Sequence, residues 1–345
     1  MRIILVGAGS WGTGWAKAVK QSPYADLAGI VDIDDEALNR VSESVGVEEG
    51  KRFRSIEDAL RSDTKADTAL VVVPPERHVE VVRRAIDAGL NCLVEKPFAP
   101  TVAEARALVD LAKSAGTELM VTQSFRFKRG PQTVKRFIER GGIGEIEAVY
   151  GRFMNAPPFT GFRVEMDEPL LVDMSVHHFD FIRGILGLEP VSVWATSFNP
   201  SWSRFKGNAC LTAKFETVSG ATIVYTGSWC SRGPATSWDG EWDIQGTRGA
   251  LVWKENRVHF YPSEFGEAVY FPGTLQRGGD VMEVSLVELE SEERGGTLAE
   301  FNAALGEGRR PEASGEDNLR TLALVLGAVE SVRTGRAIDV AEVGV

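Results

Sequence analysis

The sequence predicts an α/β domain with a doubly wound parallel sheet, followed by an α+β domain with a large, mostly antiparallel sheet. The chain has 345 residues, which is more than one hydrophobic core usually serves. Short apolar runs alternate with helical patterns up to about residue 122, as in right-handed βαβ units. Longer segments of alternating polar and apolar residues then dominate, which is typical of an antiparallel sheet. We therefore expect one domain over 1–122 and a second over 123–345.

The elements of the first domain follow one another as a parallel sheet requires. Two of its helices stop at Gly89 and Gly116, since glycine commonly ends a helix. The unbroken apolar run at 68–73 fits a strand that is covered on both faces. The expected strands are 3–6, 27–31, 68–73, 91–94 and 118–122, and the expected helices are 13–21, 35–45, a short one after Ser55, 78–88 and 102–115.

The second domain opens with a helix over 132–140, which Gly141 and Gly142 close. A helix over 176–186 interrupts the strands that follow, and two more helices, 297–304 and 316–334, end the chain. The expected strands are 145–154, 191–197, 210–216, 221–229, 241–245, 250–253 and 257–261.

Composition and charge exclude several classes of protein. The formal net charge is −11 and the basic residues form no stripe, which argues against a nucleic-acid partner. No apolar run reaches the roughly 20 residues that span a bilayer, and no signal-peptide core follows Met1. The three cysteines, Cys92, Cys210 and Cys230, are far apart and show no zinc-binding spacing. We expect a soluble, cytoplasmic protein without a membrane partner or a metal site.

A glycine-rich loop follows the first strand. Gly7-Ala8-Gly9-Ser10-Trp11-Gly12 matches GxGxxG between a predicted strand and a predicted helix, which is the context of a dinucleotide-binding Rossmann fold. Gly7 permits the tight turn, Gly9 lets the backbone approach a pyrophosphate, and Gly12 lets helix and strand pack closely. The alternative is a plain strand–turn–helix. We expect Ser10 and Trp11 to lie beside the cofactor as well.

An acidic residue follows the second strand. Asp32 lies 20 residues after Gly12, where a carboxylate accepts hydrogen bonds from the adenosine ribose. Asp34 and Asp35 add negative charge and no arginine follows at once, so a 2′-phosphate would be repelled. The sequence therefore favours NAD over NADP. The alternative is that Asp32 is only a turn residue.

Two further segments carry side chains suited to acid–base chemistry. Glu95-Lys96-Pro97 follows the strand 91–94, at the sheet edge where open α/β sheets bind ligands; a surface lysine before a proline turn is the alternative. Asp173, His177 and Asp180 are spaced four and three apart, so they share a helical face if the helix begins early enough. Packing and capping roles, or metal ligation, are the alternatives for these three.

The ordered set of motifs resembles the Gfo/Idh/MocA family, the glucose–fructose oxidoreductase and inositol dehydrogenase group. The resemblance spans nearly the whole chain and includes the late segment Ile244–Gly249. It implies that Lys96 and His177 lie near the reacting hydroxyl and that Asp173 holds the substrate. It departs from the family pattern at Ser175, where glycine is common. The residues that carry it are Gly7–Gly12, Asp32, Val73-Pro74-Pro75 with His78, Glu95-Lys96-Pro97, and Asp173 with His177 and Asp180.

The resemblance implies an NAD(P)-dependent dehydrogenase that acts on a CH–OH group of a sugar, a cyclitol or a sugar derivative. Lys96, His177 and Asp173 are the expected catalytic residues, and these three with Arg126 are expected to bind substrate. Pro74, His78, Glu95 and Lys96 are expected to border the cofactor, with a structural role for His78. Cleavage of glycosides through transient oxidation, or an NAD-sensing regulator without catalysis, are the alternatives.

Weaker signals concern substrate contacts and assembly. Arg163, like Arg126, is a candidate substrate contact, and placement on the surface is the alternative for each of them. Six of the eight tryptophans fall in the second domain. They could form a platform for a sugar ring, but the simpler interpretation is that they belong to the sheet core or to a subunit interface. The long strands of that domain need cover on the face away from the helices. We therefore expect a homodimer or homotetramer.

Overall fold

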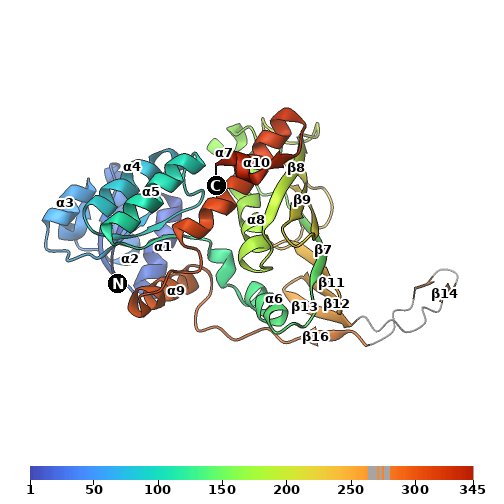
Figure 1. The fold of residues 1–345 in the computed structure, drawn as a ribbon. Helices are drawn as coiled ribbons and strands as arrows, with labels where there is room; N and C mark the ends of the chain where they lie inside the picture. Colours follow the sequence, from blue (N-terminus) through green and yellow to red (C-terminus); the bar gives the residue numbers. More distant parts are fainter. Residues whose placement is uncertain (263–269, 272–273, 276–279, 345) are drawn as a thin grey trace. The chain divides into compact units, whose positions relative to one another are not determined.

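The computed structural model describes residues 1–262, 270–271, 274–275 and 280–344. The chain forms two compact units, which are treated separately below (Figure 1). The first unit comprises Met1–Phe127 and Glu290–Leu322, and the second comprises Lys128–Leu289 and Ala323–Val345. No helix in the described part of the chain is long and apolar enough to cross a bilayer.

The first unit is built on a six-stranded parallel sheet. Its strand order is β3-β2-β1-β4-β5-β6, which is the order of the dinucleotide-binding Rossmann fold and reverses direction between β1 and β4. The strands are β1 (Arg2–Val6), β2 (Asp26–Val31), β3 (Arg52–Phe53), β4 (Thr68–Val71), β5 (Asn91–Val94) and β6 (Leu119–Val121). The helices between them are α1 (Ser10–Gln21), α2 (Asp35–Val45), α3 (Ile56–Arg61), α4 (Pro75–Asp87) and α5 (Val102–Ala115).

Local sequence explains where these helices begin and end. The Asp34 side chain accepts from the backbone N–H groups of Glu36 and Ala37 at the start of α2, and Thr101 caps α5 in the same way. Gly46 and Gly116 end these two helices in the left-handed conformation that glycine adopts without strain.

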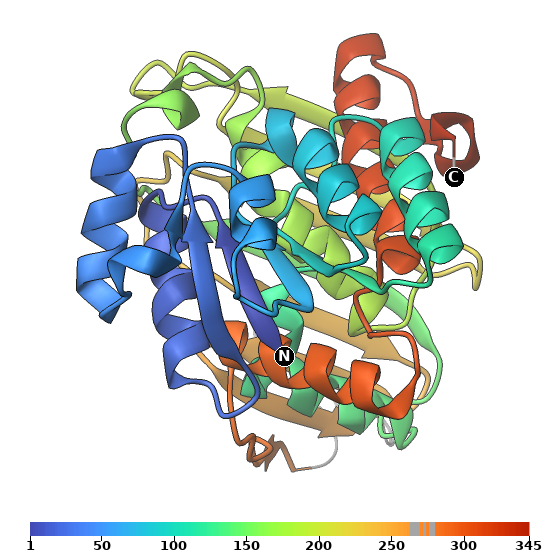
Figure 2. The ribbon, with the colours of Figure 1, turned by 90° about the vertical axis from the view of Figure 1, so that its left-hand side faces the viewer.

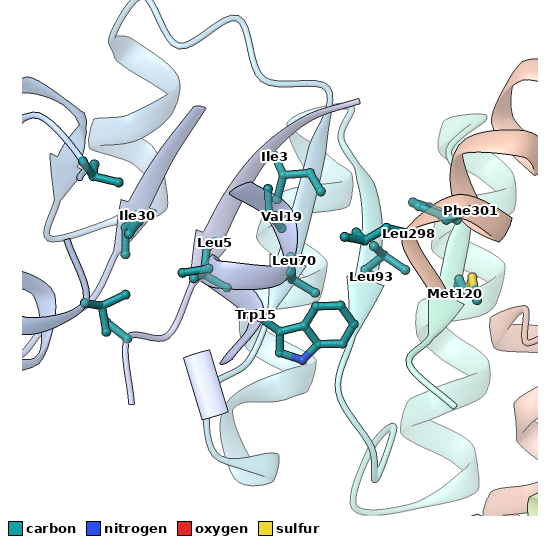
Figure 3. Close-up of a cluster of buried hydrophobic side chains, with 14 of the residues drawn as sticks. Ile3, Leu5, Trp15, Val19, Ile30, Leu70, Leu93, Met120, Leu298 and Phe301 are labelled. Atoms are coloured by element: carbon teal, nitrogen blue, oxygen red, sulfur yellow. The ribbon is translucent and has the colours of Figure 1, made fainter. Parts of the chain in front are cut away.

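The core of the first unit includes a segment from far along the chain. Leu298 and Phe301 of α9 (Glu293–Glu307) belong to the same buried cluster as Leu5 and Trp15 (Figure 3). Figure 2 shows α9, in orange, beside the blue first strands and α1. The division expected at residue 122 places α9 in the second domain, whereas its contacts lie in the first unit, because its apolar residues complete the cover of the parallel sheet.

The second unit holds a nine-stranded sheet in the order β16-β13-β12-β11-β7-β10-β9-β8-β17. All neighbours are antiparallel except β7 and β10. The strands are β7 (Ile146–Met154), β8 (Pro190–Phe198), β9 (Cys210–Thr217), β10 (Thr222–Ser228), β11 (Glu241–Gly246), β12 (Gly249–Lys254), β13 (Arg257–Pro262), β16 (Met282–Val284) and β17 (Ile338–Asp339). The two sheets confirm the expected fold class.

Helices line one face of this sheet. α6 (Arg129–Glu139) contacts β12 and β13. A π-helical turn (Leu170–Met174) leads into α8 (Ser175–Gly184), whose Phe179 ring packs edge-on against Phe215 of β9. The helix α10 (Gly315–Thr334) gives its residues up to Leu322 to the first unit and the remainder to the second. A separate short pair, β14 (Tyr270–Phe271) and β15 (Thr274–Leu275), completes the strands.

The structure sorts the tryptophans of the second unit into two groups. Trp229, Trp242 and Trp253 are buried, so the simpler interpretation, sheet core, holds for these three. Trp194, Trp202 and Trp238 each keep more than 40% of their surface exposed.

Candidate active site

The glycine loop forms an open cradle at the start of α1. Gly7 has φ +109°, and a Cβ on Gly12 would collide with the carbonyl oxygen of Gly7, so both positions require glycine. A Cβ on Gly9, in contrast, would meet no atom within 4 Å. Gly9 is also the N-cap of α1 and supplies no side-chain cap. The space beside Gly9 and the uncapped N–H groups, which begin at Ser10, fit a pyrophosphate.

Asp32 links the end of β2 to this cradle. Its Oδ2 accepts from the backbone N–H of Ala8 at 2.5 Å, and its Oδ1 accepts from the N–H of Asp34 at 2.9 Å. The carboxylate therefore lies beside the glycine loop, as ribose recognition requires.

Sequence reasoning missed a cation close to this turn. Arg54 pairs with Asp35 and donates from Nη2 to the carbonyl oxygen of Ile33 at 2.7 Å. Arg54 directly follows β3, about 20 residues after Asp32, so the sequence next to Asp32 does not reveal it.

A second cation lies over the start of α1. The guanidinium of Arg294, in α9, lies 5.0 Å from the ring centroid of Trp11 and 5.6 Å from that of Trp15. Gly14 makes room for it, since a Cβ there would lie 2.9 Å from Arg294 Nη1. No local sequence signal pairs Arg294 with the glycine loop, because 280 residues separate it from Gly14. Trp11 keeps 50% of its surface exposed.

Glu95 ties the lysine turn to α1. Trp15 Nε1 donates to Glu95 Oε1 at 2.6 Å, and the backbone N–H of Lys96 donates to Glu95 Oε2 at 3.1 Å. Trp15 is fully buried and Glu95 is 7% exposed. The carboxylate therefore fixes the backbone at Lys96, which directly follows β5 at the carboxyl edge of the sheet.

His78 joins the two turns that follow β4 and β5. Its Nδ1 lies 2.9 Å from the carbonyl oxygen of Pro97, and its Nε2 lies 2.9 Å from that of Val73. Burial lowers the pKa of this imidazole. Pro74 stands between β4 and α4 as the N-cap residue. His78 thus links the turn after β4 to the Lys96–Pro97 turn.

The Trp15–Glu95 contact leads to a first prediction. Trp15→Phe should lower the free energy of unfolding by about 1–3 kcal/mol, because it leaves a buried carboxylate oxygen without its donor. Chemical denaturation of the parent and the variant measures this, with Trp11→Phe as the control on an exposed ring. The double variant Trp15→Phe/Glu95→Gln should lose less than the sum of the single losses. Strictly additive losses in the free energy of unfolding would show that this hydrogen bond does not contribute to stability.

Arg126 has a structural role that the sequence did not reveal. Its side chain is 4% exposed, and it donates to the carbonyl oxygen of Glu312 at 2.8 Å and to Asp317 Oδ2 at 2.6 Å. The guanidinium therefore anchors the segment that leads into α10. The sequence suggested a substrate contact for Arg126, whereas the structure shows its guanidinium buried and engaged by acceptors of the chain itself.

In the second unit, the helical segment begins early enough to include Asp173. Asp173 lies in the π-helical turn and His177 in the first turn of α8. Both are half-buried, whereas Asp180 is 2% exposed. Asp173 and His177 are therefore the accessible members of the predicted group, and Asp180 belongs to the interior.

The residues next to His177 are part of the core. His178 Nδ1 lies 2.8 Å from Tyr225 Oη, and its Nε2 lies 3.1 Å from the carbonyl oxygen of Trp238. Burial lowers the pKa of His178 to about 4, so this imidazole is neutral at pH 7. Ser175 is fully buried and donates to Tyr225 Oη at 3.3 Å, so its hydroxyl is not presented to a substrate.

Arg163 is paired with Asp173. Its Nε donates to Asp173 Oδ2 at 2.5 Å. Among the described residues, no group of three or more His, Cys, Asp or Glu side chains is arranged to hold a metal ion. The second unit thus presents an arginine–carboxylate pair and a histidine.

Two models of one protein family match this chain. The model described as "Oxidoreductase family, NAD-binding Rossmann fold" of Gfo/Idh/MocA matches residues 1–123, and that of the Gfo/Idh/MocA C-terminal domain matches residues 131–252. The chain belongs to the Gfo/Idh/MocA family. As a member of this family, it is an oxidoreductase with an NAD-binding Rossmann domain, and the open cradle at Gly9 fits that cofactor.

Relatives of this Gfo/Idh/MocA protein match it over almost its full length. Inositol 2-dehydrogenase of Rhizobium meliloti is 28% identical, with 99% of each chain covered. D-apiose dehydrogenase of Rhizobium rhizogenes is 27% identical over 97% of this chain and 96% of its own. An oxidoreductase from Agrobacterium radiobacter, solved in complex with NAD⁺, L-tartaric acid and magnesium, shares the fold with a TM-score of 0.85 at 24% identity, covering 99% of this chain and 98% of its own.

Proposed function

We propose that this protein is an NAD-dependent dehydrogenase that interconverts a secondary alcohol and a ketone on a sugar, a cyclitol or a sugar derivative. The observation that carries the proposal is that a single chain of this family combines three features. These are an open dinucleotide cradle, a lysine whose backbone is held directly after β5, and the accessible side chains of Asp173 and His177. The names of the relatives, an inositol 2-dehydrogenase and a D-apiose dehydrogenase, support the substrate class.

The chain's own residues divide the work. We propose that Asp32 accepts hydrogen bonds from the adenosine ribose and that the N–H groups at the start of α1 hold the pyrophosphate. A bound NAD⁺ supplies the hydride acceptor, so that CH–OH becomes C=O and one proton is released. Lys96 and His177 take the hydroxyl proton and stabilise the developing charge on that oxygen. Asp173 accepts a hydrogen bond from the substrate and holds it in place. Lys96 and His177 are both candidates for the immediate base.

A substrate screen tests this function. Purified protein is incubated with NAD⁺ or NADP⁺ and a panel of sugars, inositols and simple glycosides, and NADH absorbance is followed. Net NADH formation with a free sugar or cyclitol supports the dehydrogenase. Release of an aglycone without net NADH assigns glycoside cleavage instead. Tight NAD binding with no turnover of any panel member or its ketone would contradict an enzymatic role.

Cofactor preference gives a second prediction. NAD⁺ should bind more tightly than NADP⁺, because the Asp32 carboxylate repels a 2′-phosphate and Asp35 already neutralises Arg54. Asp32→Ser should narrow the difference in affinity between NAD⁺ and NADP⁺. Asp32→Ser/Asp35→Ser should narrow this difference further, because it frees Arg54 from its ion pair. Fluorescence titrations of each protein with both dinucleotides at fixed salt measure the ratio. Tighter binding of NADP⁺ by the parent would refute the assignment of Asp32.

Assembly gives a third prediction. Tyr150 of β7 and Trp194 and Phe198 of β8 keep 54%, 41% and 54% of their surface exposed, and large exposed apolar patches commonly mark interaction surfaces. We propose that this sheet face is covered in a homodimer or homotetramer. Light scattering should give two or four times the 37.6 kDa chain mass, and Trp194→Lys/Phe198→Lys should shift the mass downward. A parent protein that stays monomeric at every working concentration would disprove this assembly.

The cytoplasmic location expected from composition likewise stays a proposal.

A further inference from the structure

Arg163 carries a feature that the proposed function leaves unused. It lies in the short helix α7 (Phe162–Glu165), and its only hydrogen bond within the described part of the chain runs from Nε to Asp173 Oδ2, at 2.5 Å. The guanidinium also lies 5.1 Å from the ring centroid of Phe159 and 4.8 Å from that of Phe162. The two rings and the carboxylate hold the guanidinium in place.

The way in which Arg163 binds its carboxylate differs from that of other arginines in this protein. Arg183, Arg257 and Arg333 each donate from both Nε and an Nη nitrogen to both oxygens of a single glutamate. Arg163 donates from Nε alone. The edge formed by Nη1 and Nη2 is thus left with two N–H donors directed away from Asp173, on a side chain that is 26% exposed.

That edge matches a carboxylate. The planar guanidinium presents parallel N–H groups at the spacing of two carboxylate oxygens, which makes bidentate pairs shorter and stronger than neutral hydrogen bonds. A carboxylate on this edge would be separated from Asp173 by the cation, so the repulsion between the two anions is offset. In a chain with a net charge of −11, a fixed local cation is what makes an anionic substrate acceptable.

We propose that the Nη edge of Arg163 binds a carboxylate group of the substrate, so that the substrate is a sugar acid or another carboxylate-bearing polyol. The inference rests on the proposed dehydrogenase function for the identity of the site. Asp173 then accepts from a substrate hydroxyl while Arg163 holds the acid group beside it. Phe159 packs against Trp238, with ring centroids 6.4 Å apart, and the exposed ring of Trp238 offers an apolar surface to the C–H face of the same molecule.

Matched pairs of neutral and acidic compounds test the proposal. The parent protein is assayed with NAD⁺ on D-glucose and D-glucuronate, D-galactose and D-galacturonate, and D-glucitol and D-gluconate. Binding of the three acids, of L-tartrate and of D-glucose 6-phosphate to the NAD⁺-loaded protein is measured by calorimetry. We expect at least one acid to bind and to be oxidised more efficiently than its neutral partner. Arg163→Gln should lower this acid-to-neutral ratio of kcat/KM by about 10- to 100-fold, and Arg163→Lys should lower it less.

The acid-to-neutral ratio of kcat/KM reports on anion recognition alone, because any disturbance of Asp173 affects the acidic and the neutral compound of a pair alike. Arg232→Gln is the matched control, since Arg232 also lies over an aromatic ring, that of Trp202 at 4.7 Å, and its loss should leave the ratio unchanged. Acids that bind through Arg163 without being oxidised would support this inference and contradict the proposed function. Oxidation of neutral sugars only, an unchanged ratio in Arg163→Gln, preference for the phosphate ester, or binding of no acid would overturn the inference.

Discussion

Replacing Lys96 with alanine should lower kcat by about 10²–10⁴-fold while NAD affinity changes little, because a lost general acid–base group typically costs that much. Lys96 directly follows β5, and its backbone N–H is fixed by Glu95. The dinucleotide, in contrast, is held by the glycine loop and Asp32, neither of which the substitution touches. Steady-state kinetics on a substrate that the parent turns over well, together with an NAD titration, measure the two effects separately.

The matched control for this variant is Lys113→Ala. Lys113 is an exposed lysine in the last turn of α5, so its removal changes the net charge by the same amount and should leave kcat unaltered. Lys96→Gln should be nearly as inactive as Lys96→Ala, because it keeps hydrogen-bonding capacity without the charge or the transferable proton. Near-normal turnover by Lys96→Ala would show that the chemistry lies elsewhere in the chain.

Replacing His177 with alanine should also lower kcat, by about 10²-fold or more, again with NAD affinity retained. The losses from Lys96→Ala and His177→Ala should be less than additive in free energy, because the two side chains are proposed to act on one substrate oxygen. A double-variant cycle on kcat/KM gives the coupling. Fully additive losses would mean that the two residues act in separate steps.

The adjacent histidine separates chemistry from structure. His178 lies in the core between Tyr225 and Trp238, so His178→Ala should lower the thermal midpoint through the cavity and the lost hydrogen bonds. His177→Ala, on a half-buried side chain, should leave the thermal midpoint close to that of the parent. The reverse pattern, with turnover lost only in a well-folded His178→Ala protein, would show that His178, and not His177, carries the chemistry.

The sequence alone determined the parallel α/β unit, the mostly antiparallel second sheet and the dinucleotide cradle. These features are encoded locally. A Gly7 turn with positive φ, a close approach at Gly12 and a carboxylate at the end of β2 each depend on a few neighbouring residues. Strand and helix periodicity is likewise a short-range property. The grouping of Asp173 with His177 also followed from helical spacing, although the helix begins with a π-helical turn.

Only the tertiary structure decided which charged side chains are presented and which are buried. Arg126 was expected to contact substrate, yet it is satisfied by Glu312 and Asp317, almost 200 residues later in the chain. The segment 290–322 returns to the first unit because Leu298 and Phe301 fill its core. Cys210 and Cys230 looked far apart, but the start of β9 and the segment just after β10 bring their Sγ atoms to 3.4 Å, with neither cysteine in a disulfide. Long-range packing sets these contacts, and no local pattern encodes them, because the partner of each residue is chosen by the fold rather than by its neighbours in sequence.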